Sequence, residues 1–323
     1  MKKNKLGNTD IYVTPIGLGV LTVGFSQLDL PLDEGAEIVR YAYEKGINLF
    51  DTAQYYETYP YMRKAFEGID MSRNNPDRPI IASKSLYGSY EEMENAIQEC
   101  LEALNIDHID IFKLHEVRQD PDWESRAGAW QCLVDYKNKG IVDAIGVSTH
   151  HVDVCERMAD VPECDIVFPL INYAGLGIRK GSEAGTVQEM EAAIEKCKQA
   201  GKGIFAMKAF GGGNLTGTYM KALDYVKDLG CNSIMVGMGK KSEVDDLVAY
   251  AEGRLPADYQ PDVTAKKIHI DQGDCEGCGA CVKRCPNKAI YFNENGLADI
   301  NYDICLTCGY CAPVCPVRGI IMW

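Results

Sequence analysis

Short apolar runs alternate along the chain with longer amphipathic segments. The short runs are bounded by glycine, proline or polar residues, which is typical of strands buried on both faces of a parallel sheet. We expect strands at residues 16–19, 48–51, 80–85, 109–115, 144–148, 166–170, 204–207 and 233–237. Between them, apolar positions that recur with a helical period predict helices at residues 34–45, 91–104, 123–139, 187–200 and 219–229.

This alternation predicts an α/β fold in which the parallel strands close into a (β/α)8 TIM-type barrel. An open doubly wound sheet is the alternative. Ahead of the first strand, residues 3–14 read as a β-hairpin that turns around Gly7-Asn8. Because such a barrel carries its chemistry at the C-terminal ends of its strands, candidate functional residues are sought there.

Cysteines near the end of the chain form a repeat. The run C-E-G-C-G-A-C-V-K-R-C-P begins at Cys275, and C-L-T-C-G-Y-C-A-P-V-C-P begins at Cys305. The spacing resembles that of bacterial two-cluster ferredoxins, in which the fourth cysteine of each half binds the other cluster. The resemblance implies two [4Fe-4S] clusters, the first bound by Cys275, Cys278, Cys281 and Cys315 and the second by Cys285, Cys305, Cys308 and Cys311.

Two other uses of these cysteines fit the sequence less well. Zinc sites would leave some cysteines of the repeat without a metal to bind, and a disulfide framework is typical of a small secreted chain. We therefore expect a barrel over residues 1–251, a linker over 252–267, and a small α+β ferredoxin-like domain over 268–323. This domain is too small to be held by apolar burial alone, so the clusters are expected to stabilise it.

Composition and charge limit the kinds of partner that the protein is expected to bind and the cellular compartment in which it is expected to work. The net charge of −14 argues against nucleic acid, which needs a basic surface. No window approaches the roughly 20 apolar residues of a membrane-spanning helix, and the first residues lack the apolar core of a signal peptide. We expect a cytoplasmic protein. Fourteen cysteines indicate a reducing, oxygen-poor and therefore anaerobic cell.

Polar residues at three consecutive strand ends carry a second resemblance. The second strand ends in Asp51-Thr52-Ala53-Gln54-Tyr55-Tyr56, the third in Lys84 and the fourth in His115. Together with the cysteine repeat, the chain resembles the iron-sulfur branch of the aldo-keto reductases, whose signature is D-T-A-x-x-Y followed by such a lysine and histidine. The resemblance implies a catalytic tetrad of Asp51, Tyr56, Lys84 and His115.

The chemistry implied is the interconversion of a carbonyl and an alcohol. A tyrosine with its usual pKa of about 10 is a weak acid at neutral pH. Lys84 is expected to lower the pKa of Tyr56, while Asp51 holds the lysine in place. His115 would orient the carbonyl, and Tyr56 would donate the proton while a nicotinamide supplies hydride.

Resemblance at the cofactor site is looser. It assigns nicotinamide contacts to Ser148, Asn172, Lys208, Gly237, Gly239, Lys240 and Lys241. The residues Thr149, Phe168, Ile171 and Leu247 depart from the family's pattern. NADP(H) is the first expectation, NAD(H) the second and no nicotinamide the third. A flavin is left open, although the sequence shows no flavin motif.

Two functions follow from these observations. The first is an oxidoreductase that acts on a small carbonyl or alcohol substrate, with the clusters serving electron transfer or structure. The second is a ferredoxin-linked electron-transfer protein whose barrel binds a ligand or partner without reducing carbonyls. An electron-transfer partner protein is left open. Each cluster moves one electron whereas hydride transfer moves two, which is a chemical difficulty for the first function.

Overall fold

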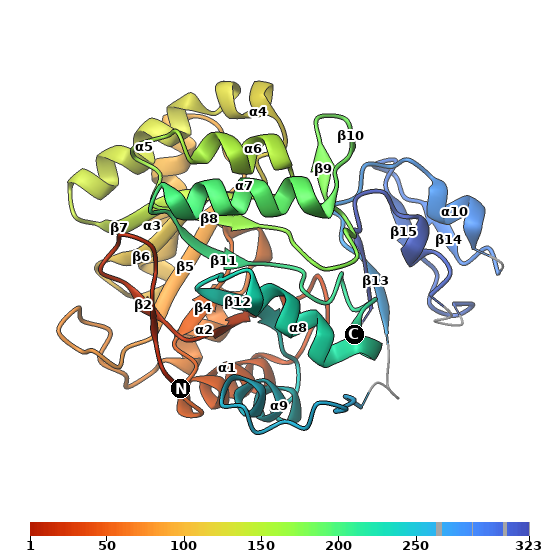
Figure 1. The fold of residues 1–323 in the computed structure, drawn as a ribbon, viewed down its shortest axis with the longest axis horizontal. Coiled ribbons are helices and arrows are strands. Elements are labelled where there is room, and N and C mark those ends of the chain that lie inside the picture. The colour runs from red at the N-terminus through yellow and green to blue at the C-terminus, as the bar shows by residue number, and fades with distance from the viewer. Residues whose placement is uncertain (263–266, 286, 306–308, 323) are drawn as a thin grey trace.

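Eight parallel strands close into a barrel in the computed structural model, which describes residues 1–262, 267–285, 287–305 and 309–322 (Figure 1). The closed sheet confirms the predicted barrel and excludes the open sheet. Around the barrel the order is β3 (Ile16–Gly19), β4 (Leu49–Asp51), β5 (Ile80–Ser85), β6 (Ile109–Leu114), β7 (Val142–Thr149), β8 (Ile166–Pro169), β11 (Gly203–Ala206) and β12 (Ser233–Gly237).

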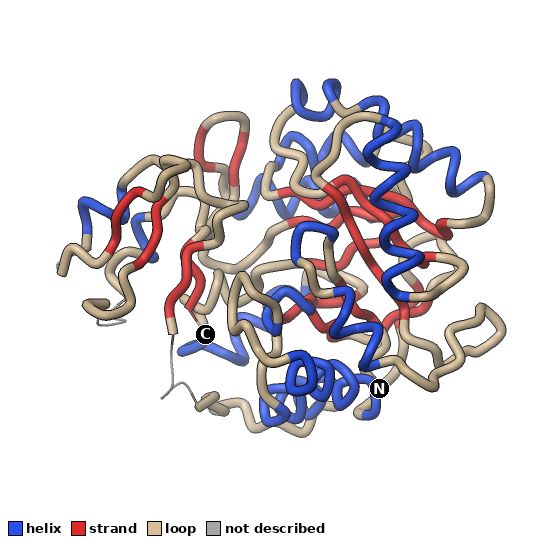
Figure 2. Tube along the Cα trace, turned by 180° about the vertical axis from the view of Figure 1, so that it is seen from behind, coloured by secondary structure: helices blue, strands red, loops and turns tan. Residues whose placement is uncertain are grey.

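Helices surround this sheet and bury their apolar faces against it (Figure 2). They are α1 (Leu32–Glu44), α2 (Tyr59–Ala65), α3 (Tyr90–Leu104), α4 (Asp120–Ser125), α5 (Ala127–Asn138), α6 (Val152–Met158), α7 (Val187–Gln199), α8 (Tyr219–Asp228) and α9 (Lys241–Ala251). A single helix was expected over residues 123–139, but the structure divides this segment at Arg126. The buried guanidinium of Arg126 donates to the carbonyl oxygens of Ser85 and His115, so the residue serves the strand ends.

The N-terminal end of the barrel is closed by the predicted hairpin. Strands β1 (Asn4–Lys5) and β2 (Tyr12–Val13) pair antiparallel, and Leu6 and Val13 are fully buried with Leu49, Ile111 and Phe205 inside the barrel. This apolar packing leaves the opposite end, where the strands finish, as the mouth of the barrel.

The C-terminal residues form a module with a core of its own. Strands β13 (Ile268–Ile270) and β16 (Ile320–Met322) pair antiparallel, as do β14 (Ile290–Phe292) and β15 (Ala298–Ile300). Helix α10 (Ala280–Arg284) packs beside them. Buried isoleucines and the cysteines Cys281 and Cys311 share this small core.

This cluster module is seated on the mouth of the barrel (Figure 1). Lys208, directly beyond β11 and Met207, forms an ion pair with Asp274, and Arg118 donates to the carbonyl oxygen of Gly273 at 2.9 Å. The backbone N–H of Met322 donates to Gly212, and a Cβ on Gly213 would lie 1.6 Å from the Met322 carbonyl oxygen. The glycines that follow Lys208 therefore admit the last strand of the module.

Every helix within the described ranges is too short or too polar to span a membrane.

Candidate active site

The structure brings the four predicted tetrad residues together at the mouth of the barrel. Asp51 ends β4, Tyr56 lies in the short 3-10 helix η2 (Gln54–Tyr56), Lys84 lies in β5, and His115 follows β6. Lys84 Nζ is 2.6 Å from Asp51 Oδ2 and 4.6 Å from the centroid of the Tyr56 ring. Tyr56 Oη is 3.3 Å from His115 Nε2.

Local hydrogen bonds explain why the D-T-A-x-x-Y segment takes this shape. The N–H of Thr52 continues the ladder to Ala82 of β5, and its carbonyl oxygen accepts from Lys84 Nζ at 2.8 Å. The hydroxyl of Thr52 lies 2.6 Å from that of Thr58, beyond the tyrosines. These contacts fix both ends of the loop, so that Tyr56 stands over the lysine.

Burial controls the protonation of the tetrad. Burial lowers the pKa of Lys84, an effect partly offset by Asp51, and lowers the pKa of His115 well below its usual value. His115 is therefore neutral at neutral pH. It can accept or donate one hydrogen bond without carrying charge.

The expected lowering of the Tyr56 pKa is not what the structure shows. Burial raises this pKa well above its usual value, and the carboxylates of Asp51, Asp271 and Asp274 raise it further. The reason is that the ring is enclosed and that the cluster module adds negative charge at the mouth. Tyr56 is thus held as a neutral phenol, the form that donates a proton.

Lys113 is a member of this group that the sequence did not reveal. It lies in β6, fully buried, directly opposite Lys84 on β5, with Nζ 2.7 Å from Asp51 Oδ1. A signal was present, since a lysine inside the apolar run I-D-I-F-K-L is unusual in a buried strand. The resemblance to the family assigns no role to this position.

Residues assigned to a nicotinamide hold internal partners instead. Ser148 Oγ accepts the N–H of Glu116 at 2.8 Å, and Asn172 is bonded at both ends of its amide to the backbone of Leu176. Lys208 is paired with Asp274 of the cluster module. Each of these groups already satisfies a polar partner within the protein.

The assigned residues at the end of β12 are similarly engaged. The N–H of Gly239 donates to Glu243 Oε2 at 2.8 Å, and a Cβ on Gly237 would lie 1.9 Å from Thr22 Oγ1. Lys240 precedes the first turn of α9, and Lys241 forms an exposed ion pair with Glu37. Gly239 and Lys241 are thus engaged by neighbouring carboxylates, and a dinucleotide that used them would have to displace these contacts.

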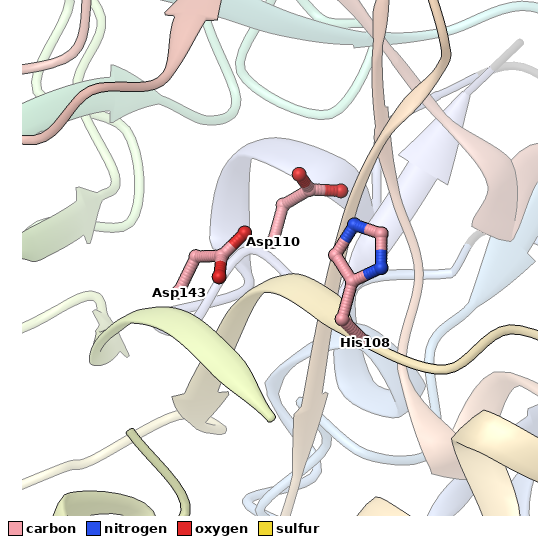
Figure 3. A group of neighbouring side chains, drawn as sticks. All are labelled: His108, Asp110 and Asp143. Atoms are coloured by element: carbon pink, nitrogen blue, oxygen red, sulfur yellow. The ribbon is translucent and has the colours of Figure 1, made fainter. Parts of the chain in front are cut away.

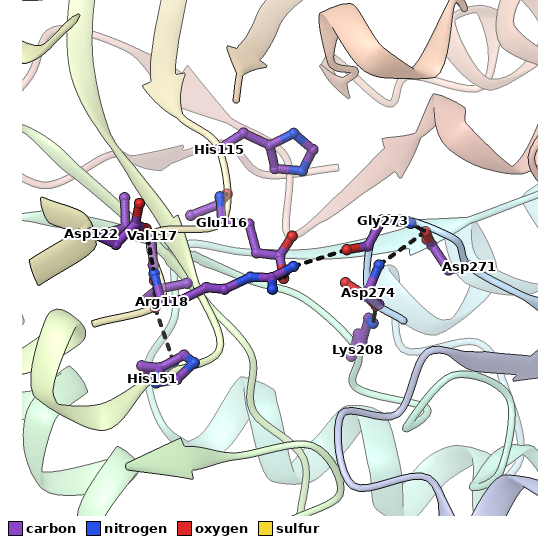
Figure 4. Close-up of polar contacts among 12 residues, drawn as sticks. His115, Glu116, Val117, Arg118, Asp122, His151, Lys208, Asp271, Gly273 and Asp274 are labelled. Atoms are coloured by element: carbon purple, nitrogen blue, oxygen red, sulfur yellow. Dashed lines mark hydrogen bonds and ion pairs between the residues drawn. The ribbon is translucent and has the colours of Figure 1, made fainter. Parts of the chain in front are cut away.

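Several charged side chains meet where the cluster module covers the mouth (Figure 4). Glu116 and Lys208 both have left-handed backbones, with φ of 51° and 57°, and both turn toward Asp274. Burial and the nearby Asp274 raise the pKa of Glu116 to about 8, while Arg118 opposes the shift. Left-handed backbone at non-glycine residues is strained, and such strain is common at functional sites.

Among the described residues, two groups that combine a histidine with two carboxyl groups have the spacing of metal ligands. His108, Asp110 and Asp143 lie together at the N-terminal ends of β6 and β7 (Figure 3), but Asp110 is paired with Arg78 and Asp143 with Arg73.

The second group is Glu116, His150 and Asp274, in which Glu116 contacts Arg118 and Asp274 contacts Lys208. Because each carboxyl group already has an arginine or lysine partner, we interpret both groups as structural.

The donor set of the cluster module fits iron-sulfur clusters. Burial and the nearby Cys315, Cys275 and Cys278 raise the pKa of Cys281 to about 11, so the other three cysteines of the first predicted set lie near Cys281. Cys311 lies near Cys285 and Cys305 of the second set, whereas Cys308 lies outside the described residues. The N–H groups of Ala298 and Ala289 point at Cys275 Sγ and Cys285 Sγ, at 3.4 and 3.3 Å.

Comparison with protein families divides the chain into the same two parts. Residues 15–243 match the aldo/keto reductase family, and residues 268–322 match the 4Fe-4S dicluster domain. L-galactose dehydrogenase of Arabidopsis thaliana is 24% identical over 76% of this chain and 86% of its own length. Methylglyoxal reductase DkgA of Yersinia pestis is 26% identical, over 45% of this chain and 48% of its own length.

Solved structures share the barrel. A putative aldo-keto reductase from Pseudomonas aeruginosa superposes with a TM-score of 0.65 at 22% identity, covering 79% of this chain and 95% of its own. At that identity the likeness shows the fold alone. The chain spans about half the length of the Yersinia relative, so that protein's substrate does not carry over directly.

Proposed function

The chain belongs to the aldo/keto reductase family and is an oxidoreductase, and we propose that its barrel interconverts a carbonyl and an alcohol with Tyr56 as proton donor. The observation that supports this most strongly is the assembled tetrad. Tyr56 Oη lies 3.3 Å from a neutral His115, and a buried Lys84–Asp51 pair lies directly behind the phenol ring. The substrate is expected to be a small aldehyde, ketone or alcohol.

The residues act on the oxygen of the substrate. A carbonyl oxygen placed beside Tyr56 and His115 accepts a hydrogen bond from the phenol, which polarises the carbonyl. When the carbonyl carbon gains hydride, the oxygen takes the Tyr56 proton and becomes the alcohol. The phenolate that remains is stabilised by Lys84 and regains its proton from solvent. In the opposite direction, phenolate accepts the proton of the alcohol.

A bound nicotinamide would supply hydride to this site, with NADP(H) proposed first and NAD(H) second. In the structure, its assigned contacts are held by other groups of the protein. Dinucleotide binding therefore requires Glu243 to release the N–H of Gly239 and Asp274 to release Lys208. We propose no step that uses those contacts as they stand.

One observation favours a second function, ferredoxin-linked electron transfer to a ligand held in the barrel. Asp274 directly precedes Cys275, the first proposed cluster ligand, and contacts Lys208 at the mouth. A Cβ on the neighbouring Gly273 would lie 3.4 Å from the Tyr55 ring. The cluster module is thus close to the tetrad, as electron transfer between them would require. Under this function, a partner protein supplies single electrons.

An anaerobic titration of cluster-replete protein with NADPH and then NADH separates the two functions. Nicotinamide fluorescence reports binding, and visible absorbance reports cluster reduction. The proposed carbonyl function predicts saturable binding of one nucleotide, with the cluster absorbance unchanged. If neither nucleotide binds, while dithionite still reduces the clusters, the first proposal fails and the electron-transfer function takes its place.

A further inference from the structure

Lys84 of the tetrad and Lys113, which lies outside it, both contact the carboxylate of Asp51. Asp51 Oδ2 is 2.6 Å from Lys84 Nζ, and Asp51 Oδ1 is 2.7 Å from Lys113 Nζ. The lysines are register partners on β5 and β6, and both are almost completely buried. Lys113 Nζ also lies 4.6 Å from the centroid of the Phe205 ring and 5.1 Å from that of Phe168.

Charge balance distinguishes this arrangement from a simple ion pair. Asp51 and Lys84 alone would be neutral together, whereas the addition of Lys113 leaves one net positive charge on the group of three, of which Lys84 lies against the phenol ring. Stability does not readily explain the second lysine, because a buried ion pair is commonly no more stabilising than apolar residues of the same size. A retained buried charge at a catalytic centre instead suggests a part in the reaction.

We propose that Lys113 is a positioning residue of the tetrad, which fixes the carboxylate of Asp51 and supplies the net positive charge that favours the Tyr56 phenolate. The inference rests on the proposed function of Tyr56 as proton donor. Lys113 acts through Asp51 and Lys84 and does not touch the substrate. With Lys113 present, Asp51 offsets less of the Lys84 charge, so the phenolate forms more easily when the proton leaves.

The protonation of Lys113 is consistent with this role. Burial lowers its pKa to about 8, and the adjacent Lys84 lowers it while Asp51 opposes the shift. Lys113 is therefore mainly charged at neutral pH and loses its charge as the pH rises through 8. Besides the tetrad itself, the charged or titratable groups that act on Tyr56 or His115 include Glu116, Arg126, His150, Asp271 and Asp274.

The test replaces the charge of Lys113 and reads the titration of Tyr56 directly. A fluorinated tyrosine placed at position 56 lowers the phenol pKa into a range where the fold persists, and 19F NMR follows its titration. In Lys113→Met, the midpoint should rise by about one pH unit, which is the lower end of the range of pKa shifts expected when a nearby opposite charge is lost. Lys113→Gln keeps a hydrogen-bond donor but no charge, and it should give the same rise.

Lys202 offers a matched control. It is also a buried lysine in the barrel, but its Nζ donates to the Val161 carbonyl oxygen, away from the tetrad. Lys202→Met should leave the midpoint of position 56 unchanged. Equal midpoints in wild type, Lys113→Met and Lys113→Gln would overturn the proposal. If Lys113→Met does not fold, Lys113→Gln tests the proposal by itself, because glutamine keeps a hydrogen-bond donor for Asp51.

Measurement of turnover provides a second test, which distinguishes failure of this inference from failure of the proposed function. Lys113→Met should lower kcat for a carbonyl about tenfold below pH 8, with KM nearly unchanged, since a shift of one pKa unit corresponds to a tenfold change. The deficit should narrow above pH 8, where wild-type Lys113 loses its charge. A shifted 19F titration in a protein that turns over no carbonyl would retain Lys113 and reject the proposed function.

Discussion

Tyr56→Phe is expected to lower kcat for carbonyl reduction by about 10²- to 10⁴-fold, the usual contribution of a positioned general acid. The substitution removes the hydroxyl that lies 3.3 Å from His115 and leaves the ring over Lys84. Because only the proton donor is lost, KM for the carbonyl should change much less than kcat. Initial rates across a panel of aldehydes and ketones measure the effect.

The neighbouring tyrosine gives the control for this prediction. Tyr55 is 37% exposed and packs against Tyr56 with ring centroids 6.4 Å apart. Tyr55→Phe should retain turnover within a few-fold, and both variants should keep the visible absorbance of the clusters. Full activity in Tyr56→Phe would remove Tyr56 from its role and with it the proposed mechanism.

Removal of iron is expected to unfold the cluster module while the barrel persists. The module has short strands and a small apolar core that includes the cysteines themselves. Core burial in a unit of this size supplies little stability, so cluster binding and folding should be coupled. Anaerobic chelation should therefore make residues 268–322 sensitive to protease, as read by mass spectrometry. The helical circular dichroism of the barrel should remain.

Cysteine variants show whether this effect belongs to the ligands. Cys285→Ser removes one proposed ligand of the second cluster and should reproduce the protease sensitivity. Cys231→Ser changes a half-buried barrel cysteine that lies outside the repeat, and it should behave as wild type. A module that stays protected without iron would contradict the proposal that the clusters hold it together.

The barrel could be predicted because its signal is local. Runs such as residues 80–85 and 233–237 became strands with the same bounds, since each contains a short apolar stretch that a strand buried on both faces requires. The split at Arg126 was missed because it depends on carbonyl oxygens at the ends of distant strands. Helical periodicity continues through that position and carries no trace of those contacts.

The candidate site was likewise predictable where its signal is local and not where it depends on tertiary contacts. The proximity of Asp51, Lys84 and His115 could be predicted because each stands at a strand end within a known motif. Lys113 was visible as a lysine in an apolar run, yet its role depends on the register between β5 and β6. The partners Glu243 and Asp274, which hold the assigned nicotinamide contacts, act through tertiary contacts that a sequence motif does not encode.

The most direct measurement is the origin of the hydrogen on the carbonyl carbon of the product. Protein is incubated anaerobically with a carbonyl substrate and nucleotide that carries deuterium at the transferable C4 position, and the alcohol is analysed by mass spectrometry. A hydride-transferring barrel predicts one deuterium on the former carbonyl carbon, and it predicts that this labelled alcohol forms far more slowly in Tyr56→Phe. An alcohol whose new C–H hydrogen comes from solvent would contradict hydride transfer, and no alcohol from any substrate would contradict the carbonyl function itself.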